Sequence, residues 1–297
     1  MSTAVRPRVG AVILTQGKRP DDLRAAIDSV LSQQGVDVDV VCVGNGWAPV
    51  DLPEGVATLA LPENLGIPAG RNAGVPHVSG DLLLFVDDDA RLVDTDFLAR
   101  ASELFAGDRR LGVVQPRVES PGEKAPTRWI PRMRKGDPRR SSPAFSLWEG
   151  VLVVRRAAFD AAGGWGDEYF YAHEGIELAW RVWDAGYEVW YRGDLRCAHP
   201  AIDASIRTPL MLQTVLQRGP RPDPTRAPVA IRFTARTVGL AERRQSLRLS
   251  PREDIDPFGA VSAAIGGIWG MREDRYSELR TLETAARPKV EMSYIGG

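Results

Sequence analysis

Short apolar runs alternate with amphipathic stretches along the first 120 residues of the chain. Apolar residues between Leu23 and Val30 recur at spacings of three and four, which predicts a helix over residues 21–34. The continuous apolar run 82–86 predicts a strand buried on both faces, because such a strand needs an apolar side chain at every position. Other strands are expected at 9–14, 37–43, 56–61 and 111–118, with further helices from about residue 68 and over 96–106.

This alternation predicts an α/β fold in which right-handed crossovers build a mostly parallel central sheet with helices on both faces. Residues 119–147 interrupt the pattern with five prolines and are expected to form a long loop. Beyond this loop, the pattern predicts a strand at 150–154, helices over 157–162 and 174–185, and two short strands at 188–191 and 196–198.

The apolar pattern weakens beyond residue 205, which predicts a first domain over residues 1–205 and a mainly helical C-terminal extension over 206–297. Within the extension, a helix is expected at 210–217 and a proline-rich linker at 218–228. The segment 257–271 carries an apolar stripe at helical spacing. Three interpretations stay open for it: docking on the first domain, which we favour, contact with a partner, or contact with a membrane surface.

Composition and charge argue against some classes of function. A formal net charge of −1 argues against a general nucleic-acid binder, although residues 128–140 carry six basic side chains against one acidic. This basic segment could order over an anionic ligand or stay solvated. No signal peptide and no run of 18 apolar residues is present, so we expect a cytoplasmic protein whose membrane contact, if any, is peripheral. Both cysteines, Cys42 and Cys197, fall in predicted strands and are expected to be core residues.

Three consecutive carboxylates, Asp87, Asp88 and Asp89, directly follow the apolar run 82–86. Like charges this close repel one another strongly unless a cation lies among them. Oxygen ligands at alternate positions suit Mg²⁺ or Mn²⁺, especially where a substrate diphosphate completes the coordination shell. The alternative is a solvated acidic turn that precedes the next helix.

Three other segments are expected at the same edge of the sheet, where ligands of open α/β folds usually bind. Small and amide side chains there let a nucleotide approach the backbone, and Arg71 can neutralise phosphate. Each segment alone is also compatible with an ordinary turn between a strand and a helix. The candidate donor-binding residues in these segments are Thr15, Gln16, Arg19, Asn45, Gly70, Arg71 and Asn72.

The order of these motifs resembles that of the family 2 glycosyltransferases over about residues 8–200. The motifs are NLGIPAGRNAG, GDLLLFVDDDA, a GGW followed by an acidic aromatic run, HEGIELAWR and a final His199. The resemblance implies a GT-A fold, which is a nucleotide-binding α/β sandwich. It also implies an inverting hexosyltransferase that moves a sugar from a UDP-, GDP- or dTDP-sugar to a hydroxyl group of a glycan, a lipid-linked or a small-molecule acceptor.

The resemblance also assigns roles. Asp87 and Asp89 are expected to hold Mn²⁺ or Mg²⁺, and His199 matches a position that often gives a further metal ligand. Asp87 and Asp88 join the donor-binding residues. A neutral imidazole ligand suits Mn²⁺ better than Mg²⁺.

A single displacement also needs a base for the acceptor hydroxyl. Many members of the family read Glu-Asp at the start of the helix after GGW, with the Asp as base, whereas this chain reads Glu174-Gly175. The role therefore falls to Glu174 or, as second choice, to Glu177, which lies three residues on and shares its helix face. Both could instead be ordinary helix-start residues.

Two alternatives to a glycosyltransferase stay open. A sugar nucleotidyltransferase would carry a glycine-rich basic loop after the first strand, and residues 15–20 hold only one glycine. A non-catalytic homologue that binds sugar nucleotides or glycans would be compatible with the missing Asp at Gly175.

Overall fold

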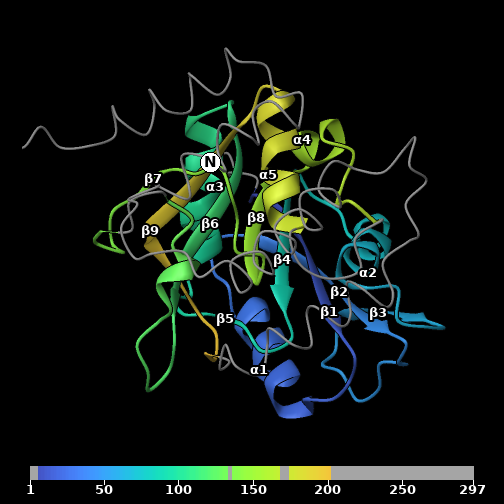
Figure 1. Cartoon of the computed structure of the whole chain (residues 1–297). Helices are drawn as coiled ribbons and strands as arrows, with labels where there is room; N and C mark the ends of the chain where they lie inside the picture. Colours follow the sequence, from blue (N-terminus) through green and yellow to red (C-terminus); the bar gives the residue numbers. More distant parts are fainter. Residues whose placement is uncertain (1–5, 133–135, 168–173, 202–297) are drawn as a thin grey trace, which may run out of the picture.

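A central sheet of nine strands runs through the part of the chain that this computed structural model describes, residues 6–132, 136–167 and 174–201 (Figure 1). The strand order is β3-β2-β1-β4-β8-β6-β9-β5, and β7 also pairs with β9. The strands are β1 Arg8–Thr15, β2 Asp37–Asn45, β3 Val56–Leu61, β4 Leu82–Asp87, β5 Arg91–Leu92, β6 Leu111–Glu119, β7 Ser142–Pro143, β8 Val151–Arg155 and β9 Glu188–Ala198.

The first half of the sheet, β3-β2-β1-β4, is parallel. The second half is mixed, because β8 runs antiparallel to both of its neighbours, β4 and β6, while β6 and β9 are parallel. The α/β fold class is therefore confirmed, and the expected parallel arrangement holds for the first half of the sheet. Since β2 and β4 flank β1, the chain changes direction across the sheet at β1, and ligands of such folds bind at the carboxyl ends of the strands next to this point.

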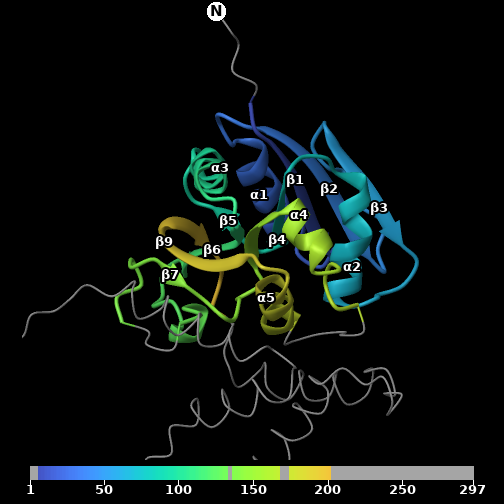
Figure 2. The same ribbon diagram turned by 90° about the horizontal axis from the view of Figure 1, so that it is seen from above.

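Helices cover both faces of the sheet (Figure 2). Helices α1 and α3 pack on one face, and α2, α4 and α5 lie on the other. Right-handed crossovers explain this division, because the crossover from β1 to β2 and the return to β4 move in opposite directions across the sheet. The helices are α1 Pro20–Leu31, α2 Ile67–Gly74, α3 Phe97–Gly107, α4 Arg156–Ala161 and α5 Glu174–Asp184, with short 3₁₀ turns at η1 Val75–His77 and η2 Thr127–Trp129.

Two apolar clusters fill the space between the sheet and these helices. Alternate residues of β4 divide between them, so that Leu84 packs toward α1 and α3 while Phe85 packs toward α4 and α5. Phe85 stacks edge-on against Trp165 with ring centroids 5.3 Å apart. Both cysteines are buried and free, as the sequence predicts. Burial of β4 on both faces fixes the position at which its acidic end leaves the sheet.

The last strand differs from the prediction. The two short strands expected at 188–191 and 196–198 form one strand, β9, whose register against β6 shifts between Arg192 and Arg196. Residues 193–195 form the bulge, and the backbone N–H of Gly193 donates to the hydroxyl of Ser141 at 3.0 Å. The expected gap between two strands is therefore a β-bulge within one strand.

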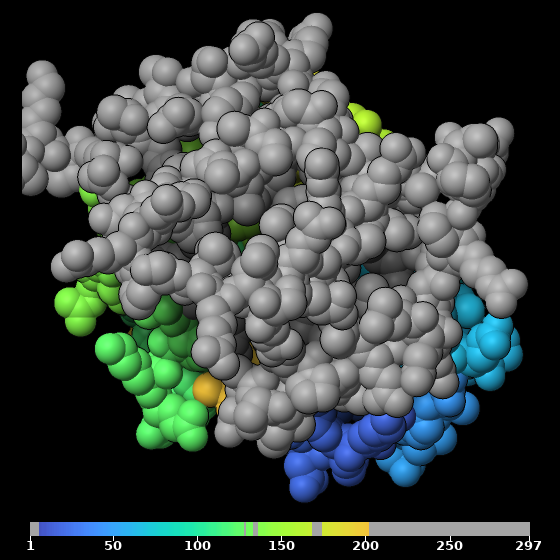
Figure 3. Space-filling view, viewed as in Figure 1, coloured from blue at the N-terminus to red at the C-terminus, as the bar shows by residue number. Residues whose placement is uncertain are grey.

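The segment after β6 is largely irregular, as expected, but it packs against the fold. Trp129 is 2% exposed and Arg132 is 6% exposed, and the guanidinium of Arg132 lies over the ring of Tyr191. The end of β9 lies beside this segment, since the N–H of Ala201 donates to the hydroxyl of Ser120 at 3.0 Å. Figure 3 shows the gold end of the described chain next to the green residues that follow β6.

The predicted boundary at residue 205 and the helical extension over 206–297 lie outside the described residues. Among the described residues, no helix combines the length and the apolar character needed to cross a membrane.

Gly74 and Gly107 each end a helix, and they offer a matched test of how tightly α2 is packed. A Cβ at Gly74 would lie 2.6 Å from a methyl of Val12 and 2.8 Å from one of Val43, whereas a Cβ at Gly107 would meet nothing within 4 Å. We expect Gly74→Ala to lower the free energy of unfolding by about 1–3 kcal/mol through overpacking. Gly107→Ala should be neutral or stabilise by up to about 1 kcal/mol. Urea unfolding measures both, and equal effects would contradict the close packing.

Candidate active site

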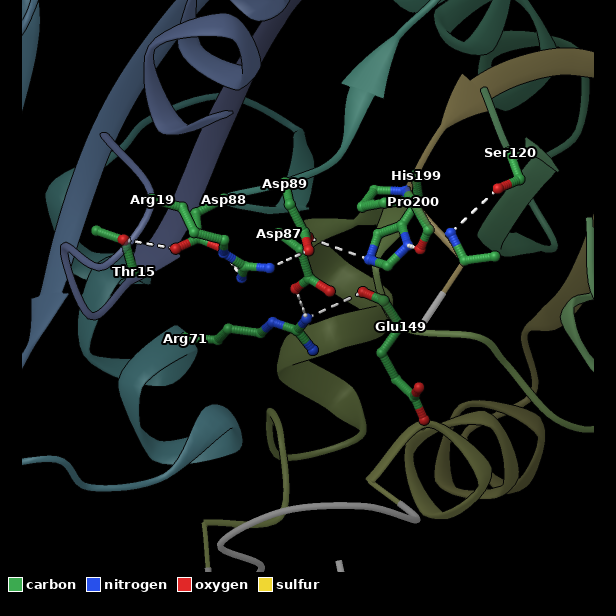
Figure 4. Close-up of polar contacts among 11 residues, drawn as sticks. Thr15, Arg19, Arg71, Asp87, Asp88, Asp89, Ser120, Glu149, His199 and Pro200 are labelled. Atoms are coloured by element: carbon green, nitrogen blue, oxygen red, sulfur yellow. Dashed lines mark hydrogen bonds and ion pairs between the residues drawn. The ribbon is translucent and has the colours of Figure 1, made fainter. Parts of the chain in front are cut away.

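The three carboxylates at the end of β4 point into different surroundings (Figure 4). Asp88 and Asp89 are 6% and 4% exposed, while the side chain of Asp87 is 32% exposed. Parallel pairing sets Asp87 beside Leu14, so the next residue of β1, Thr15, lies close to the acidic turn. The hydroxyl of Thr15 donates to Asp88 at 2.6 Å. Two neighbouring strands thus hold the acidic turn in place.

Arg19, at the start of α1, forms ion pairs with both buried carboxylates. Its Nη2 donates to Asp88 Oδ1 and its Nη1 donates to Asp89 Oδ2. Burial raises the pKa of Asp88, although Thr15 and Arg19 act in the opposite direction. Burial also acts to raise the pKa of Asp89, but the hydrogen bond and charge of His199, with the charge of Arg19, outweigh it and lower that pKa. The guanidinium therefore stabilises a charge that burial disfavours.

His199 follows β9 and reaches the same turn from the other half of the sheet. Its Nε2 lies 3.1 Å from Asp89 Oδ1, and its Nδ1 lies 2.7 Å from the carbonyl oxygen of Pro200. Two indole rings, Trp129 and Trp148, contact the imidazole edge-on at centroid distances of 5.4 and 5.1 Å. Burial acts to lower the pKa of His199, but the hydrogen bond to Asp89 and its charge outweigh burial and raise it.

Asp87, Asp89 and His199, the three predicted metal ligands, lie together. Each offers one ligand atom, and these atoms lie within 4.8 Å of one another. Because a carbonyl oxygen occupies Nδ1 of His199, its Nε2 is the nitrogen that faces the carboxylates, an orientation typical of ligating histidines. Two carboxylates and one imidazole suit Mn²⁺, and they leave coordination positions for a diphosphate. The residues present therefore fit a divalent cation.

Arg71 places a buried positive charge beside Asp87. The residue is 1% exposed, and its Nη2 donates to Asp87 Oδ1 at 2.6 Å and to the backbone oxygen of Glu149 at 3.0 Å. Its guanidinium carbon lies 4.9 Å from the ring centroid of Trp165. These contacts fix Arg71 at the edge of the metal-binding group.

Three predicted donor-binding residues are engaged with the protein itself. The amide of Asn45 accepts from Leu65 N at 2.8 Å and donates to Gly66 O at 3.0 Å. The amide of Asn72 accepts from Trp165 N at 2.9 Å and donates to Trp165 O at 2.8 Å.

A Cβ at Gly70, the third of these residues, would lie 2.6 Å from a methyl of Leu14. Asn45, Gly70 and Asn72 therefore shape the site, and their direct contact with a donor stays a prediction. Gln16 is exposed beside Thr15, and its role also stays a prediction.

The two predicted bases differ in their surroundings. Glu177 forms a bidentate ion pair with Arg181, whose Nη2 lies 2.6 Å from Glu177 Oε2. Arg181 also donates to Ala162 O, so this pair ties α5 to the end of α4. Glu174 is 3% exposed at the first turn of α5, and its charge acts on a third carboxylate, that of Glu149.

Glu149 is a functional candidate that the sequence analysis missed. It precedes β8, and its Oε1 accepts from the backbone N–H of Gly175 at 2.8 Å. Burial and then the charge of Glu174 raise the pKa of Glu149 to about 8, although Arg71 and the N–H of Gly175 act in the opposite direction. The only sequence signal was a carboxylate directly before a buried strand, and nothing in the sequence shows that this strand pairs with β4.

Comparison with known proteins identifies the family. The model of the family described as "Glycosyl transferase family 2" matches residues 11–162, just over half of the 297-residue chain. The chain belongs to glycosyl transferase family 2. The match covers the acidic turn, Arg71 and Glu149, and it confirms the resemblance to the family, while the GGW, HEGIELAWR and His199 motifs lie beyond it.

Solved structures confirm the GT-A fold. Residues 1–349 of TarS from S. aureus align over 92% of this chain and 83% of that one, with a TM-score of 0.52 and 13% identity. The mannosyltransferase PcManGT from Pyrobaculum calidifontis, in complex with GDP-Man and Mn²⁺, aligns over 95% and 86%, with a TM-score of 0.54 and 17% identity. GalNAc-T7, with UDP, GalNAc and Mn²⁺, aligns over 91% and 54%, with a TM-score of 0.55 and 13% identity. At such identities the likeness shows the fold alone.

A curated protein matches only locally. GTP 3',8-cyclase of Synechococcus sp. (strain WH7803) is 44% identical over 48 residues, which are 15% of this chain and 14% of that protein. So short a match says nothing about the function of this glycosyltransferase-family chain.

Removing the carboxylate of Glu149 should stabilise the protein increasingly as the pH rises. The pKa of Glu149 is raised from 4.5 to about 8 in the folded state, so between these values the folded protein keeps a proton that the unfolded chain has released. Wild-type stability therefore falls with pH in this window, and Glu149→Gln avoids the loss while its amide oxygen still accepts from Gly175. We expect the difference in Tm, variant minus wild type, to grow from pH 5 to pH 9.

Glu54 is an exposed carboxylate and supplies the control. Its variant Glu54→Gln should follow the wild-type pH profile of Tm. A Glu149→Gln profile that also runs parallel to wild type would contradict the raised pKa.

Proposed function

We propose that this chain is a metal-dependent inverting glycosyltransferase of the hexosyltransferase class. It would move a sugar from a nucleoside-diphosphate donor, with a uracil, guanine or thymine base, to an acceptor hydroxyl. The observation that carries the proposal is the group of Asp87, Asp89 and His199 at the carboxyl edge of a family 2 sheet. Complexes of two neighbours with GDP-Man and Mn²⁺, and with UDP, GalNAc and Mn²⁺, support a nucleotide-sugar donor and this metal.

The donor diphosphate would lie at the crevice beside β1 and β4. A divalent cation held by Asp87, Asp89 and His199 would neutralise the negative charge that develops on the leaving diphosphate. Thr15 and Arg19 keep Asp88 and Asp89 in place, which would orient the proposed ligand Asp89 before the donor binds. Arg71 holds Asp87 from the opposite side and adds a positive charge near the phosphates.

Inversion requires that the acceptor hydroxyl attacks the sugar from the face opposite the diphosphate. As the new bond to the anomeric carbon forms, the bond to the diphosphate oxygen breaks, and a carboxylate takes the hydroxyl proton. Glu149, Glu174 and Glu177, around the start of α5, are the candidates for this base. The acceptor, which could be a glycan, a lipid-linked or a small molecule, and the cytoplasmic location stay predictions.

A non-catalytic homologue is the second candidate, because Gly175 replaces the expected Asp. Such a protein would bind a nucleoside diphosphate with Mn²⁺ but release none from a nucleotide sugar. A nucleotidyltransferase is less favoured, since the turn after β1 carries only one glycine, Gly17, and this glycine packs against Trp47.

Thermal unfolding with UDP, GDP and dTDP, each with and without Mn²⁺, tests the binding half of the proposal. One nucleotide should raise Tm only with Mn²⁺, since a ligand held at 100 times its Kd adds about 2.7 kcal/mol of stability. Asp89→Ala should abolish the Mn²⁺-dependent shift, and Asp28→Ala, at an exposed ion pair on α1, should keep it. A full shift in Asp89→Ala would contradict the metal site, and no shift in wild type would contradict the proposed function.

A further inference from the structure

Glu149 and Gly175 share one space. A Cβ built on Gly175 would lie 2.2 Å from Oε1 of Glu149 and 2.6 Å from its Cδ and Cγ. Real Cβ atoms do not approach other atoms this closely, so no larger residue fits at 175 while the Glu149 side chain stays where it is. The Glu149 carboxylate thus occupies the volume into which a side chain at 175 would extend.

The backbone does not explain why residue 175 is glycine. Among the described glycines, those with positive φ do not include Gly175, so an alanine or aspartate would meet no backbone strain there. Glycine is also a poor helix former, about 1 kcal/mol worse than alanine inside a helix. Among the described residues, the Glu149 side chain is what a larger side chain at 175 would meet.

Glu149 is anchored between the metal-binding group and α5. Its backbone oxygen accepts from Arg71 Nη2 at 3.0 Å, and the same nitrogen donates to Asp87 at 2.6 Å. The next residue, Gly150, accepts from the backbone N–H of Asp87 at 2.8 Å. In Figure 4 the side chain of Glu149 extends away from the Asp cluster toward α5, where Gly175 N–H binds Oε1 at 2.8 Å. Its carboxylate therefore has a fixed position relative to the metal ligands.

The other two carboxylates fit the role of a base less well. Both oxygens of Glu177 are engaged by Arg181, which neutralises the charge. Glu174 is only 3% exposed, which leaves little surface for an acceptor, whereas Glu149 keeps part of its surface accessible. Like-charge repulsion between Glu149 and Glu174 makes Glu174 a positioning residue that tunes its neighbour.

We propose that Glu149, from the space left by Gly175, is the general base that takes the proton of the acceptor hydroxyl. This assignment rests on the proposed function. Oε1 stays hydrogen-bonded to Gly175 N–H, and Oε2 takes the proton. The hydroxyl oxygen then bonds to the anomeric carbon, and the electron pair of the broken bond leaves on the diphosphate.

The charges around Glu149 agree with this role. Burial and the charge of Glu174 raise its pKa to about 8, while Arg71 and the N–H of Gly175 oppose the shift. A base works best when its pKa lies near the working pH, since it is then both available and strong enough to take the proton. We therefore expect kcat to rise with pH up to about 8.

Moving the carboxylate from position 149 to position 175 tests, without any substrate, whether the two side chains compete for one volume. Gly175→Asp alone should collide with Glu149 and lower Tm by about 3–10 °C. In the double variant Glu149→Ala/Gly175→Asp the collision is removed, so its Tm should exceed that of Gly175→Asp alone. If the two substitutions change Tm additively, the shared space is contradicted.

The same variants test the base by release of nucleoside diphosphate. The donors are UDP-glucose, UDP-galactose, GDP-mannose and dTDP-glucose, each with Mn²⁺, and water, free monosaccharides and alkyl glycosides serve as acceptors. Glu149→Gln should lower kcat by about 10²–10⁴-fold. Its donor KM and its Mn²⁺-dependent Tm shift with the nucleotide should stay unchanged, which shows that the variant is folded.

The double variant should recover at least about 10-fold in kcat over Glu149→Ala, because it returns a carboxylate to the same space. Glu54→Gln, at an exposed carboxylate, should keep kcat within about threefold of wild type, and Glu174→Gln should move the pH profile of kcat to lower pH. An active wild type with Glu149→Gln within threefold of it would overturn the assignment of the base. A wild type that shows neither turnover nor a Tm shift with any of these ligands would instead overturn the proposed function, and the assignment with it.

Discussion

Negative charge buried at the carboxyl ends of β1 and β4 is the constraint on which the rest of this site depends. Asp88 and Asp89 are almost fully buried, and each needs a cation or a donor close by. The partners come from separate elements: Arg19 from the start of α1, and His199 from the end of β9. Since these elements are far apart in the sequence, the acidic turn is stable only when both halves of the sheet have formed around it.

Much of the fold could be predicted because apolar periodicity acts locally. β3, a partly exposed edge strand, was predicted at its observed bounds. The other strands of the parallel half were predicted within one or two residues of theirs, because apolar periodicity follows the burial of side chains. The helix predicted over 21–34 ends at Leu31, because the backbone N–H of Gln34 donates to the carbonyl oxygen of Thr95 at 2.8 Å instead of continuing the helix. The pairing of the strands could be predicted less well than their positions. The antiparallel course of β8 and the bulge in β9 depend on contacts between distant segments, which single-sequence patterns do not record.

In the site too, some residues could be recognised from the local sequence, and others only from contacts between distant segments. The acidic turn was visible because three carboxylates after an apolar run are chemically unusual, and the resemblance to the family added His199 to them. The donor side stays a prediction, since the amides of Asn45 and Asn72 bind backbone groups in the structure and their contact with a donor is untested. Glu149 was missed because its significance comes from two neighbours, Arg71 and Gly175, that only the paired strands and α5 bring to it.

If Glu149 takes the place of a carboxylate on α5 as the base, different contacts fix the position of the base. The packing of one helix against the sheet would position a base on α5. Glu149 instead directly precedes Gly150, whose carbonyl oxygen accepts from the backbone N–H of Asp87. Under this assignment, the distance between base and metal ligands is set by the pairing of β4 and β8, the most deeply buried strands of the fold. The cost is the repulsion between two neighbouring carboxylates, Glu149 and Glu174. Stability lost to such a pair is expected where a charge is kept for chemistry rather than for folding.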